Sequence, residues 1–345
     1  MHPRIFIGGT GRSGTSIVYK ALGCHEKIHS FPREMRFLVD PDGLVTLVDS
    51  LSTRYSPIIA REALFRFERL MRIYLTDPRH TPYRGFDLPA WLGHDNYWQR
   101  LDDFCESVAE VEYRGVAWQV ERNGDGRLVE WARTLQGMRR RLQGRPSPSA
   151  TSAGEQLDRE RLKSARYFRG RAPLVQATAR FVDDLFFHAA QLHGKETWCE
   201  KTPQNIFHLK FLTELFPDSA IIHIKRDPRA VVHSMTKQSW NRSPNDVHDV
   251  CLMLRNLYRR WLDLRDELDT EQTPYFELKI EEIAAAPEEQ LGQLVSAIGI
   301  EGAFHDLPAI TLERVNYWRD TMPQEAQNVA NELLGPYIEA MGYER

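Results

Sequence analysis

A glycine-rich stretch near the beginning of the chain has the residue types of a site that binds a phosphate-like anion. It covers residues 8–16, follows a short apolar run at residues 4–7 and precedes an apolar helical run at residues 17–22. Glycines let the backbone fold tightly around an anion, and the first amides of the following helix then point at it with the positive end of the helix dipole behind them. The stretch therefore predicts a phosphate cradle, and a structural turn before a helix is the alternative interpretation.

The stretch departs at one position from the loop that binds ATP or GTP. Its spacing is Gly9-x4-Gly14-Thr15-Ser16, whereas the nucleotide loop has lysine where Thr15 stands. Another cation must then hold the anion, and Arg12 lies inside the turn with a guanidinium fork that suits an anion with two oxygens. A P-loop kinase, which would also need carboxylates for Mg²⁺, or another nucleotide-binding protein stays open as an alternative.

A second group of cations follows another apolar run. Residues 220–224 read as a hydrophobic strand, and Arg226 comes directly after its end. Ser234 lies eight residues after Arg226, one or two turns into the next predicted helix, where its hydroxyl can join Arg226 on a single anion. Two anion sites in one sheet predict a ligand that is phosphorylated at both ends.

Two further residues have the chemistry to act near the glycine loop. Lys201 follows a strand predicted from residue 196 and can reach a ligand as a point charge. Glu34 follows a loop or short strand at residues 23–32, which we expect to lie beside the first strand and to open onto the same crevice. An ordinary solvated charge is the alternative for each.

Repeated strand-then-helix units must position these residues, and they predict an α/β fold. The predicted strands lie at residues 4–7, 196–199, 220–224 and 274–280. This alternation indicates a P-loop-like parallel sheet flanked by helices, in a single domain of residues 1–345. Residues 41–172 show helical periodicity, and we expect them to form a helical insertion that covers the active-site crevice. Residues 144–154 predict a flexible loop because they are rich in glycine, proline and serine.

The composition limits the classes of function. The 345 residues carry 45 Lys and Arg against 48 Asp and Glu, which gives a net charge of -3 and no sign of a nucleic-acid partner. The four cysteines are far apart and lack a metal-binding spacing, so we expect reduced thiols and no metal site. No run approaches the ~18 apolar residues of a membrane span, and no room precedes the first strand for a signal peptide. We therefore expect a cytoplasmic protein.

These motifs together resemble the PAPS-dependent sulfotransferase superfamily, and most closely its tyrosylprotein and bacterial branch. Arg226 and Ser234 are similar to the pair that grips the 3'-phosphate of the donor 3'-phosphoadenosine 5'-phosphosulfate (PAPS). The family's loop for the 5'-phosphosulfate is matched here by Gly11, Arg12, Ser13, Gly14, Thr15 and Ser16. The resemblance implies a bacterial-type sulfotransferase that uses PAPS as co-substrate.

The resemblance also implies catalytic roles. Glu34 resembles the branch's general base, and Lys201 resembles the lysine that steadies the transferring group, with Arg12 as a further cation. The implied reaction is in-line transfer of a sulfuryl group to a hydroxyl or amine acceptor without a metal. The chemical rivals of Glu34 as base are His25, His29 and His223.

The end of the chain resembles the tail that covers the cofactor in bacterial members. Trp318 and Arg319 are similar to its cofactor-binding residues. The sequence departs from the branch at Ile280, where the branch has tyrosine beside the adenine, and at Tyr317, where the branch has a basic residue. How the adenine is held therefore stays open.

The acceptor and the oligomeric state also stay open. A small-molecule or peptide hydroxyl is expected, which includes sugars, lipids, phenols and peptides. The aromatic residues that could shape its pocket are Trp91, Tyr97, Trp98 and Trp118. A non-catalytic PAP- or PAPS-binding protein is a further alternative, because such a protein would need the anion sites but not Glu34 and Lys201 together.

Overall fold

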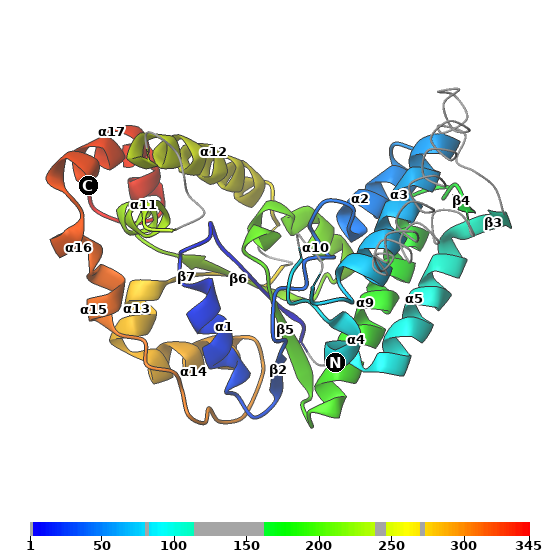
Figure 1. Ribbon diagram of the computed structural model, residues 1–345. Coiled ribbons are helices and arrows are strands. Elements are labelled where there is room, and N and C mark those ends of the chain that lie inside the picture. Colours follow the sequence, from blue (N-terminus) through cyan, green and yellow to red (C-terminus); the bar gives the residue numbers. More distant parts are fainter. Residues whose placement is uncertain (1–2, 80–82, 114–161, 239–245, 270–272) are drawn as a thin grey trace, which may run out of the picture. The chain divides into compact units, whose positions relative to one another are not determined.

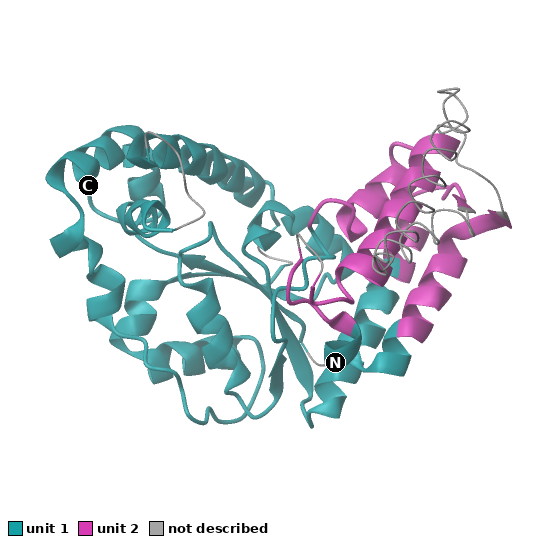
Figure 2. Cartoon of the chain, in the orientation of Figure 1, with its two compact units in different colours: residues 1–39, 89–97, 178–345 teal, residues 40–88, 98–177 magenta. Residues whose placement is uncertain are grey.

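The computed structural model describes residues 3–79, 83–113, 162–238, 246–269 and 273–345. The loop predicted at residues 144–154, and Trp118, lie outside these described residues. The chain divides into two compact units (Figure 2). Unit 1 comprises residues 1–39, 89–97 and 178–345, and unit 2 comprises residues 40–88 and 98–177.

A five-stranded parallel sheet forms the centre of unit 1 (Figure 1). Its spatial order is β2-β5-β1-β6-β7, and every neighbouring pair is parallel. The strands are β1 (Ile5–Gly8), β2 (Ile28–Ser30), β5 (Thr197–Lys201), β6 (Ala220–Lys225) and β7 (Tyr275–Lys279). The predicted parallel α/β sheet is thereby confirmed.

The expected position of the second strand was wrong. β5 lies between β1 and β2, so β2 is an edge strand rather than the neighbour of β1. All five residues of β5 are buried, whereas β2 has only three residues and a less buried end. A fully buried strand belongs inside a parallel sheet and a short strand suits its edge. The last strand, β7, also ends one residue earlier than predicted, because Ile280 begins a helix.

The two faces of the sheet are packed by different sets of side chains. Ile5 and Ile7 of β1 belong to a core cluster with helix α1 and the helices after β7. Phe6 lies on the other face, where its ring meets Trp198 of β5 edge to face at 5.3 Å. Trp198 in turn contacts Phe186 of the long helix before β5. The sheet is therefore covered on both faces, as its continuous apolar strands require.

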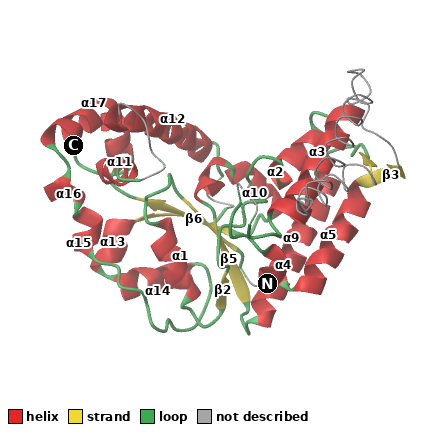
Figure 3. Ribbon diagram, viewed as in Figure 1, coloured by secondary structure: helices red, strands yellow, loops and turns green. Residues whose placement is uncertain are grey.

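Helices make up most of the rest of unit 1 (Figure 3). They are α1 (Thr15–Gly23), η2 (Pro203–Phe207), α10 (Leu209–Leu215), α11 (Pro228–Thr236), α12 (Asp246–Asp266), α13 (Ile280–Ala285), α14 (Pro287–Ala297), α15 (Leu312–Asn316), α16 (Trp318–Thr321) and α17 (Gln324–Ala340). α11, α12 and α17 share a second core cluster that includes Tyr258, Trp261 and Trp318.

Unit 2 is mainly helical. It contains α2 (Leu44–Ser52), α3 (Pro57–Arg69), the π-helical turn η1 (Leu70–Tyr74), and a two-stranded antiparallel sheet of β3 (Ala109–Tyr113) and β4 (Leu162–Ala165). Three helices have residues in both units: α4 (Leu88–Leu92), α5 (His94–Val108) and α9 (Ala172–Leu192). No helix among the described residues is long and apolar enough to cross a membrane.

Two histidines on the sheet are buried and held neutral. His223 of β6 is fully buried, its ring packs on Trp261 at 4.7 Å, and burial lowers its pKa to about 3 with help from Lys225 and Arg265. Burial, His193 and Lys195 lower the pKa of His29 in β2 to about 4. At these buried positions a proton is unfavourable on either rival of Glu34.

These histidines are expected to make the protein less stable in mild acid. The unfolded chain binds the proton near pH 6.5 and the folded chain does not, so stability is complete above that pH and falls as the pH drops toward 4 and 3. At pH 5 the loss from His223 alone is about 2 kcal/mol. The difference in the free energy of unfolding between pH 7.5 and pH 5, measured by urea unfolding, gives this loss. The His223→Asn variant should show a smaller difference between the two pH values, and an equal difference would contradict the assignment.

Candidate functional site

The glycine loop between β1 and α1 has a backbone shape that suits an anion. Gly11, Arg12 and Gly14 have φ values of 77°, 57° and 98°, which place three residues of one turn in the left-handed region. Helix α1 begins directly afterwards at Thr15. Successive amides in such a turn, together with the unbonded amides of a helix N-terminus, form a cradle for a negatively charged group. Arg12 is strained in this region because it carries a Cβ, and such strain is typical of functional sites.

The other loop residues have distinct positions. Ser13 and Thr15 are buried, whereas Arg12 and Ser16 are exposed. Ser13 Oγ lies against Gly9, where a Cβ would approach it to 2.4 Å. The loop thus presents one guanidinium and one hydroxyl outward, while its other side chains fix its shape.

Gly14 can be tested as the residue that permits this shape. A Cβ at Gly14 would come within 2.7 Å of Ile280 Cγ1, and its φ of 98° is unfavourable for an L-residue. Gly14→Ala is therefore expected to lower the free energy of unfolding by about 1–3 kcal/mol. Gly292→Ala is the matched control, because Gly292 lies inside α14 with nothing within 4 Å of the added methyl group. Equal urea midpoints for the two variants would contradict this role of Gly14.

Arg12 comes together with Arg226 and Ser234, although more than two hundred residues separate it from either of them. Arg12 Nε donates to Ser234 Oγ at 3.0 Å, and Arg226 Nη1 donates to the carbonyl oxygen of Arg12 at 3.1 Å. Arg226 Nη2 also donates to the carbonyl oxygen of Val315 at 2.7 Å. The two anion-binding motifs of the sequence are therefore directly hydrogen-bonded to each other, with Arg12 and Ser234 in contact.

Arg226 is a partly buried cation. Burial lowers its pKa, Glu281 opposes this shift and Arg12 adds to it. Within the described residues, the buried Nε of Arg226 and the buried Oγ of Ser13 have no hydrogen-bond partner. Two guanidinium groups close together, one with an unsatisfied donor, form a site suited to an anion with several oxygens.

Glu34 and Lys201 form an ion pair next to the glycine loop. Lys201 ends β5 and only 7% of its surface is exposed. Its Nζ lies 2.7 Å from Glu34 Oε1 and donates to Ser16 Oγ at 3.3 Å. A carboxylate, an ammonium group and a hydroxyl from three separate segments thus meet at the carboxyl end of the sheet. A carboxylate and a cation so placed have the chemistry to act on one ligand.

A buried carboxylate that the motif analysis did not single out supports this pair. Glu200 of β5 accepts hydrogen bonds from the Met35 amide at 2.9 Å, from Thr202 Oγ1 at 2.7 Å and from Asn205 Nδ2 at 2.8 Å. Burial raises its pKa, and the three hydrogen bonds oppose that shift. Because Met35 follows Glu34, Glu200 fixes the segment that carries Glu34. The sequence feature that could have identified Glu200 is a carboxylate within a strand that is otherwise expected to be buried.

An open cavity of about 820 Å³ adjoins Lys201 and lies within unit 1. Its volume is in the range of small-molecule sites. Its lining comprises Ser16, Tyr19, Lys20, Gly23, Ile28, His29, Ser30, Phe31, Pro32, Arg33, Ala90, Trp91, His193, Lys195 and Lys201. Of the aromatic residues considered for an acceptor pocket, Trp91 lines this cavity and Tyr97 is buried.

The tail residues lie near Arg226 but differ in exposure. Trp318 is 3% exposed and packs in the core of α11, α12 and α17, with the Arg229 guanidinium 5.0 Å from its ring. Arg319 is exposed and lines a smaller cavity of about 260 Å³ with Arg229 and Tyr343. Tyr317 is 53% exposed. Trp318 thus supports the tail from inside, while Arg319 faces outward.

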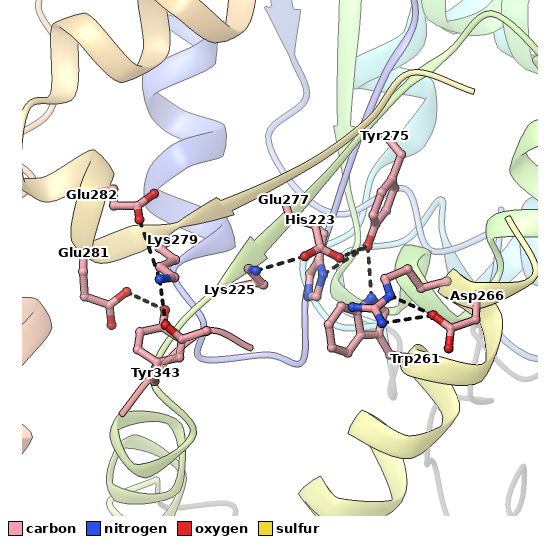
Figure 4. Close-up of polar contacts among 12 residues, drawn as sticks. His223, Lys225, Trp261, Asp266, Tyr275, Glu277, Lys279, Glu281, Glu282 and Tyr343 are labelled. Carbon is pink, nitrogen blue, oxygen red and sulfur yellow. Dashed lines mark hydrogen bonds and ion pairs between the residues drawn. The ribbon is translucent and has the colours of Figure 1, made fainter. Parts of the chain in front are cut away.

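Gly342 and Tyr343, near the end of the chain, are hydrogen-bonded to the last residue of β7 and to α13 (Figure 4). Tyr343 Oη donates to Glu281 Oε2 at 2.7 Å, and Lys279 Nζ donates to the carbonyl oxygen of Gly342 at 2.8 Å. Glu281 Oε1 accepts from the amide of Asp227, the residue after Arg226, at 3.2 Å. Glu281 therefore joins the C-terminal end to the strand end that carries Arg226.

Neither a metal cluster nor a disulfide accompanies these residues in the described parts of the chain. There, no group of three or more His, Cys, Asp or Glu side chains is placed to hold a metal ion. Cys24, Cys105, Cys199 and Cys251 are unpaired cysteines, and three of them are buried. Burial raises the pKa of Cys251 to about 12, which leaves it protonated near neutral pH.

The sequence matches a known family over more than half of its length. The model described as Sulfotransferase family matches residues 105–306, a range that contains Lys201, Arg226 and Ser234. Two curated relatives are the omega-hydroxy-beta-dihydromenaquinone-9 sulfotransferases Stf3 of Mycobacterium bovis and Mycobacterium tuberculosis. Each is 26% identical over 232 residues, which cover 59% of this chain and 56% of the relative. The chain thus spans about half the length of the curated relatives it matches.

Two solved structures are similar along nearly the whole chain at low sequence identity. The sulfotransferase domain of the Synechococcus PCC 7002 olefin synthase is 15% identical with a TM-score of 0.49, and the match covers 100% of this chain and 96% of that one. Sulfotransferase STF9 of Mycobacterium avium is 14% identical with a TM-score of 0.41, over 99% of this chain and 78% of that one.

Proposed function

Because the chain belongs to the sulfotransferase family, we propose that it transfers a sulfuryl group from PAPS to a hydroxyl or amine group of an acceptor. The observation that carries the proposal is the ion pair of Glu34 and Lys201 beside Ser16 of the glycine loop. A base, a cation and an anion cradle then lie within one compact unit, and this transfer needs all three.

The residues of the two linked motifs fit a donor with phosphate groups at two positions. In the proposal, residues 11–16 hold the 5'-phosphosulfate, and Arg226 and Ser234 hold the 3'-phosphate. The unsatisfied Nε of Arg226 and the contact between Arg12 and Ser234 support this assignment. Arg12 would bind between the two groups, and the tail with Trp318 and Arg319 would cover the nucleoside.

The chain's own groups can perform the transfer. PAPS supplies a sulfuryl group whose bond to the 5'-phosphate oxygen breaks as the acceptor oxygen bonds to sulfur. Glu34 takes the proton of the acceptor hydroxyl, a general-base contribution of roughly 10²- to 10⁴-fold. Lys201, Arg12 and the loop amides stabilise the negative charge that grows on the phosphate oxygen. Glu200 keeps Glu34 in reach by holding the Met35 amide.

Incubation with PAPS and a panel of alcohols, phenols, amines and tyrosine peptides tests the proposal. We expect 3'-phosphoadenosine 5'-phosphate (PAP) to form in an acceptor-dependent manner, with one sulfated product for each PAP released. The curated relatives, named for a hydroxylated acceptor, favour a hydroxyl over an amine. Consumption of ATP with Mg²⁺, with PAPS left intact by every acceptor, would contradict the proposal.

A further inference from the structure

The cavity beside Lys201 has an uneven charge distribution. Of the described residues that line it, four are cations, namely Lys20, Arg33, Lys195 and Lys201, and none is a carboxylate. Its walls are otherwise mainly apolar or aromatic, with Tyr19, Phe31 and Trp91 among them. A site with this lining favours a ligand that has both an apolar part and a negative charge.

The lining residues of the cavity are spread along two elements, and the two ends of this spread differ. On α1 its lining runs from Ser16 to Gly23, roughly 10 Å at the rise of an α-helix. Along the chain it runs from Lys195, before β5, to Lys201 at the end of the strand, which is at most roughly 20 Å for an extended chain. The ion pair with Glu34 therefore lies at one end only, and Lys195 lies toward the other.

The end near Lys195 contains an unsatisfied buried donor or acceptor. His29 lines the cavity, is only 7% exposed, and its Nε2 has no hydrogen-bond partner within the described residues. Its ring stacks on His193 at 4.6 Å. Lys195 Nζ donates to the carbonyl oxygen of His25 at 2.8 Å, which holds the ammonium group in place. A polar atom of a ligand can satisfy His29 beside a fixed cation.

We infer that the acceptor is an amphipathic alcohol with an anionic group, whose hydroxyl lies at Glu34 and Lys201 and whose anionic group lies toward Lys195 and His29. This inference rests on the proposed function for the position of the hydroxyl. The apolar part of the acceptor packs on Tyr19, Phe31 and Trp91, which lie among the same lining residues. The anion is recognised by charge, so a carboxylate and a phosphate ester share the required chemistry.

Calorimetric titration of the full chain saturated with PAP tests the inference. The probes are a medium-chain fatty acid with a terminal hydroxyl, the phosphate monoester of the diol of the same chain length, and that diol itself. Each anionic probe is expected to bind about tenfold more tightly than the diol, a ratio that one favourable ion pair can supply. Tighter binding by only one of them identifies the anion as a carboxylate or a phosphate. Equal binding of acid, ester and diol, or no binding of any of them, would overturn the inference.

Substitutions test whether the preference for an anionic probe comes from the end of the cavity near Lys195. Lys195→Gln should remove most of the preference for the anionic probe, whereas Lys195→Arg should keep it. Lys20→Gln is an independent second variant, and Lys210→Gln, an exposed lysine of α10 that does not line the cavity, is the control. An unchanged preference in both Lys195→Gln and Lys20→Gln would overturn the inference. Titration with PAP alone distinguishes failure of this inference from failure of the proposed function. If PAP itself does not bind, the proposed function is contradicted, and not only the inference about the acceptor.

Discussion

Glu34→Gln is expected to lower turnover by about 10²- to 10⁴-fold and to leave the affinity for PAP nearly unchanged. The amide keeps the size and position of the side chain, but it cannot accept a proton from the acceptor. Glu34 contacts Lys201 rather than the residues proposed to bind the 3'-phosphate. The measurements are the rate of PAP formation at saturating substrates and the dissociation constant of PAP.

Two variants show whether such a loss comes from the base or from a missing ion pair. Glu62→Gln is the matched control, because Glu62 pairs with Arg61 at 3.0 Å and has a side-chain exposure of 27%, close to the 29% of Glu34. Glu34→Asp restores a base with a shorter reach and should recover part of the activity. Full turnover in Glu34→Gln would remove Glu34 from the role of general base.

Arg226→Ala is expected to weaken PAP binding by about 10- to 100-fold, because hydrogen bonds to a charged group contribute about 1.5–3 kcal/mol. The affinity for 5'-AMP, which lacks the 3'-phosphate, should fall much less. Arg226 also holds the carbonyl oxygens of Arg12 and Val315, so some loss of stability accompanies the change. A loss of stability would weaken the binding of PAP and of 5'-AMP alike. The ratio of the two affinities therefore reports the contact with the 3'-phosphate alone.

Arg314→Ala is the control for this second prediction, because Arg314 is an exposed arginine next to Val315, whose carbonyl oxygen accepts from Arg226. Its ratio of PAP to 5'-AMP affinity should equal that of the unmodified protein. If Arg226→Ala weakened both nucleotides equally, Arg226 would act through the fold and the assignment of the 3'-phosphate would be wrong.

Local pattern was sufficient to predict the elements that carry the site. The apolar runs before Gly8 and before Arg226 became β1 and β6, and the stretches after them became α1 and α11. The positions of these strands and helices depend on residues that are close together in the sequence: apolar runs, glycines and the residues that begin a helix. The sequence alone therefore predicts that the residues following these strands lie at the same edge of a parallel sheet.

Features that depend on distant pairing could not be predicted in this way. The insertion of β5 between β1 and β2 follows from the burial of whole strands. The hydrogen bond between Arg12 and Ser234 joins residues 222 positions apart, so no local pattern encodes it. The three hydrogen bonds to Glu200 likewise depend on how separate segments pack.

The measurement that tests the account most directly is thermal unfolding with PAP, with 5'-AMP or with ATP and Mg²⁺, each at one high concentration. A ligand at 100 times its dissociation constant adds about 2.7 kcal/mol, which raises the midpoint by a few degrees. The account predicts a clear shift with PAP, a smaller one with 5'-AMP, and little with ATP and Mg²⁺. A shift with ATP and Mg²⁺ but none with PAP would contradict the two-phosphate site, and with it the proposed donor.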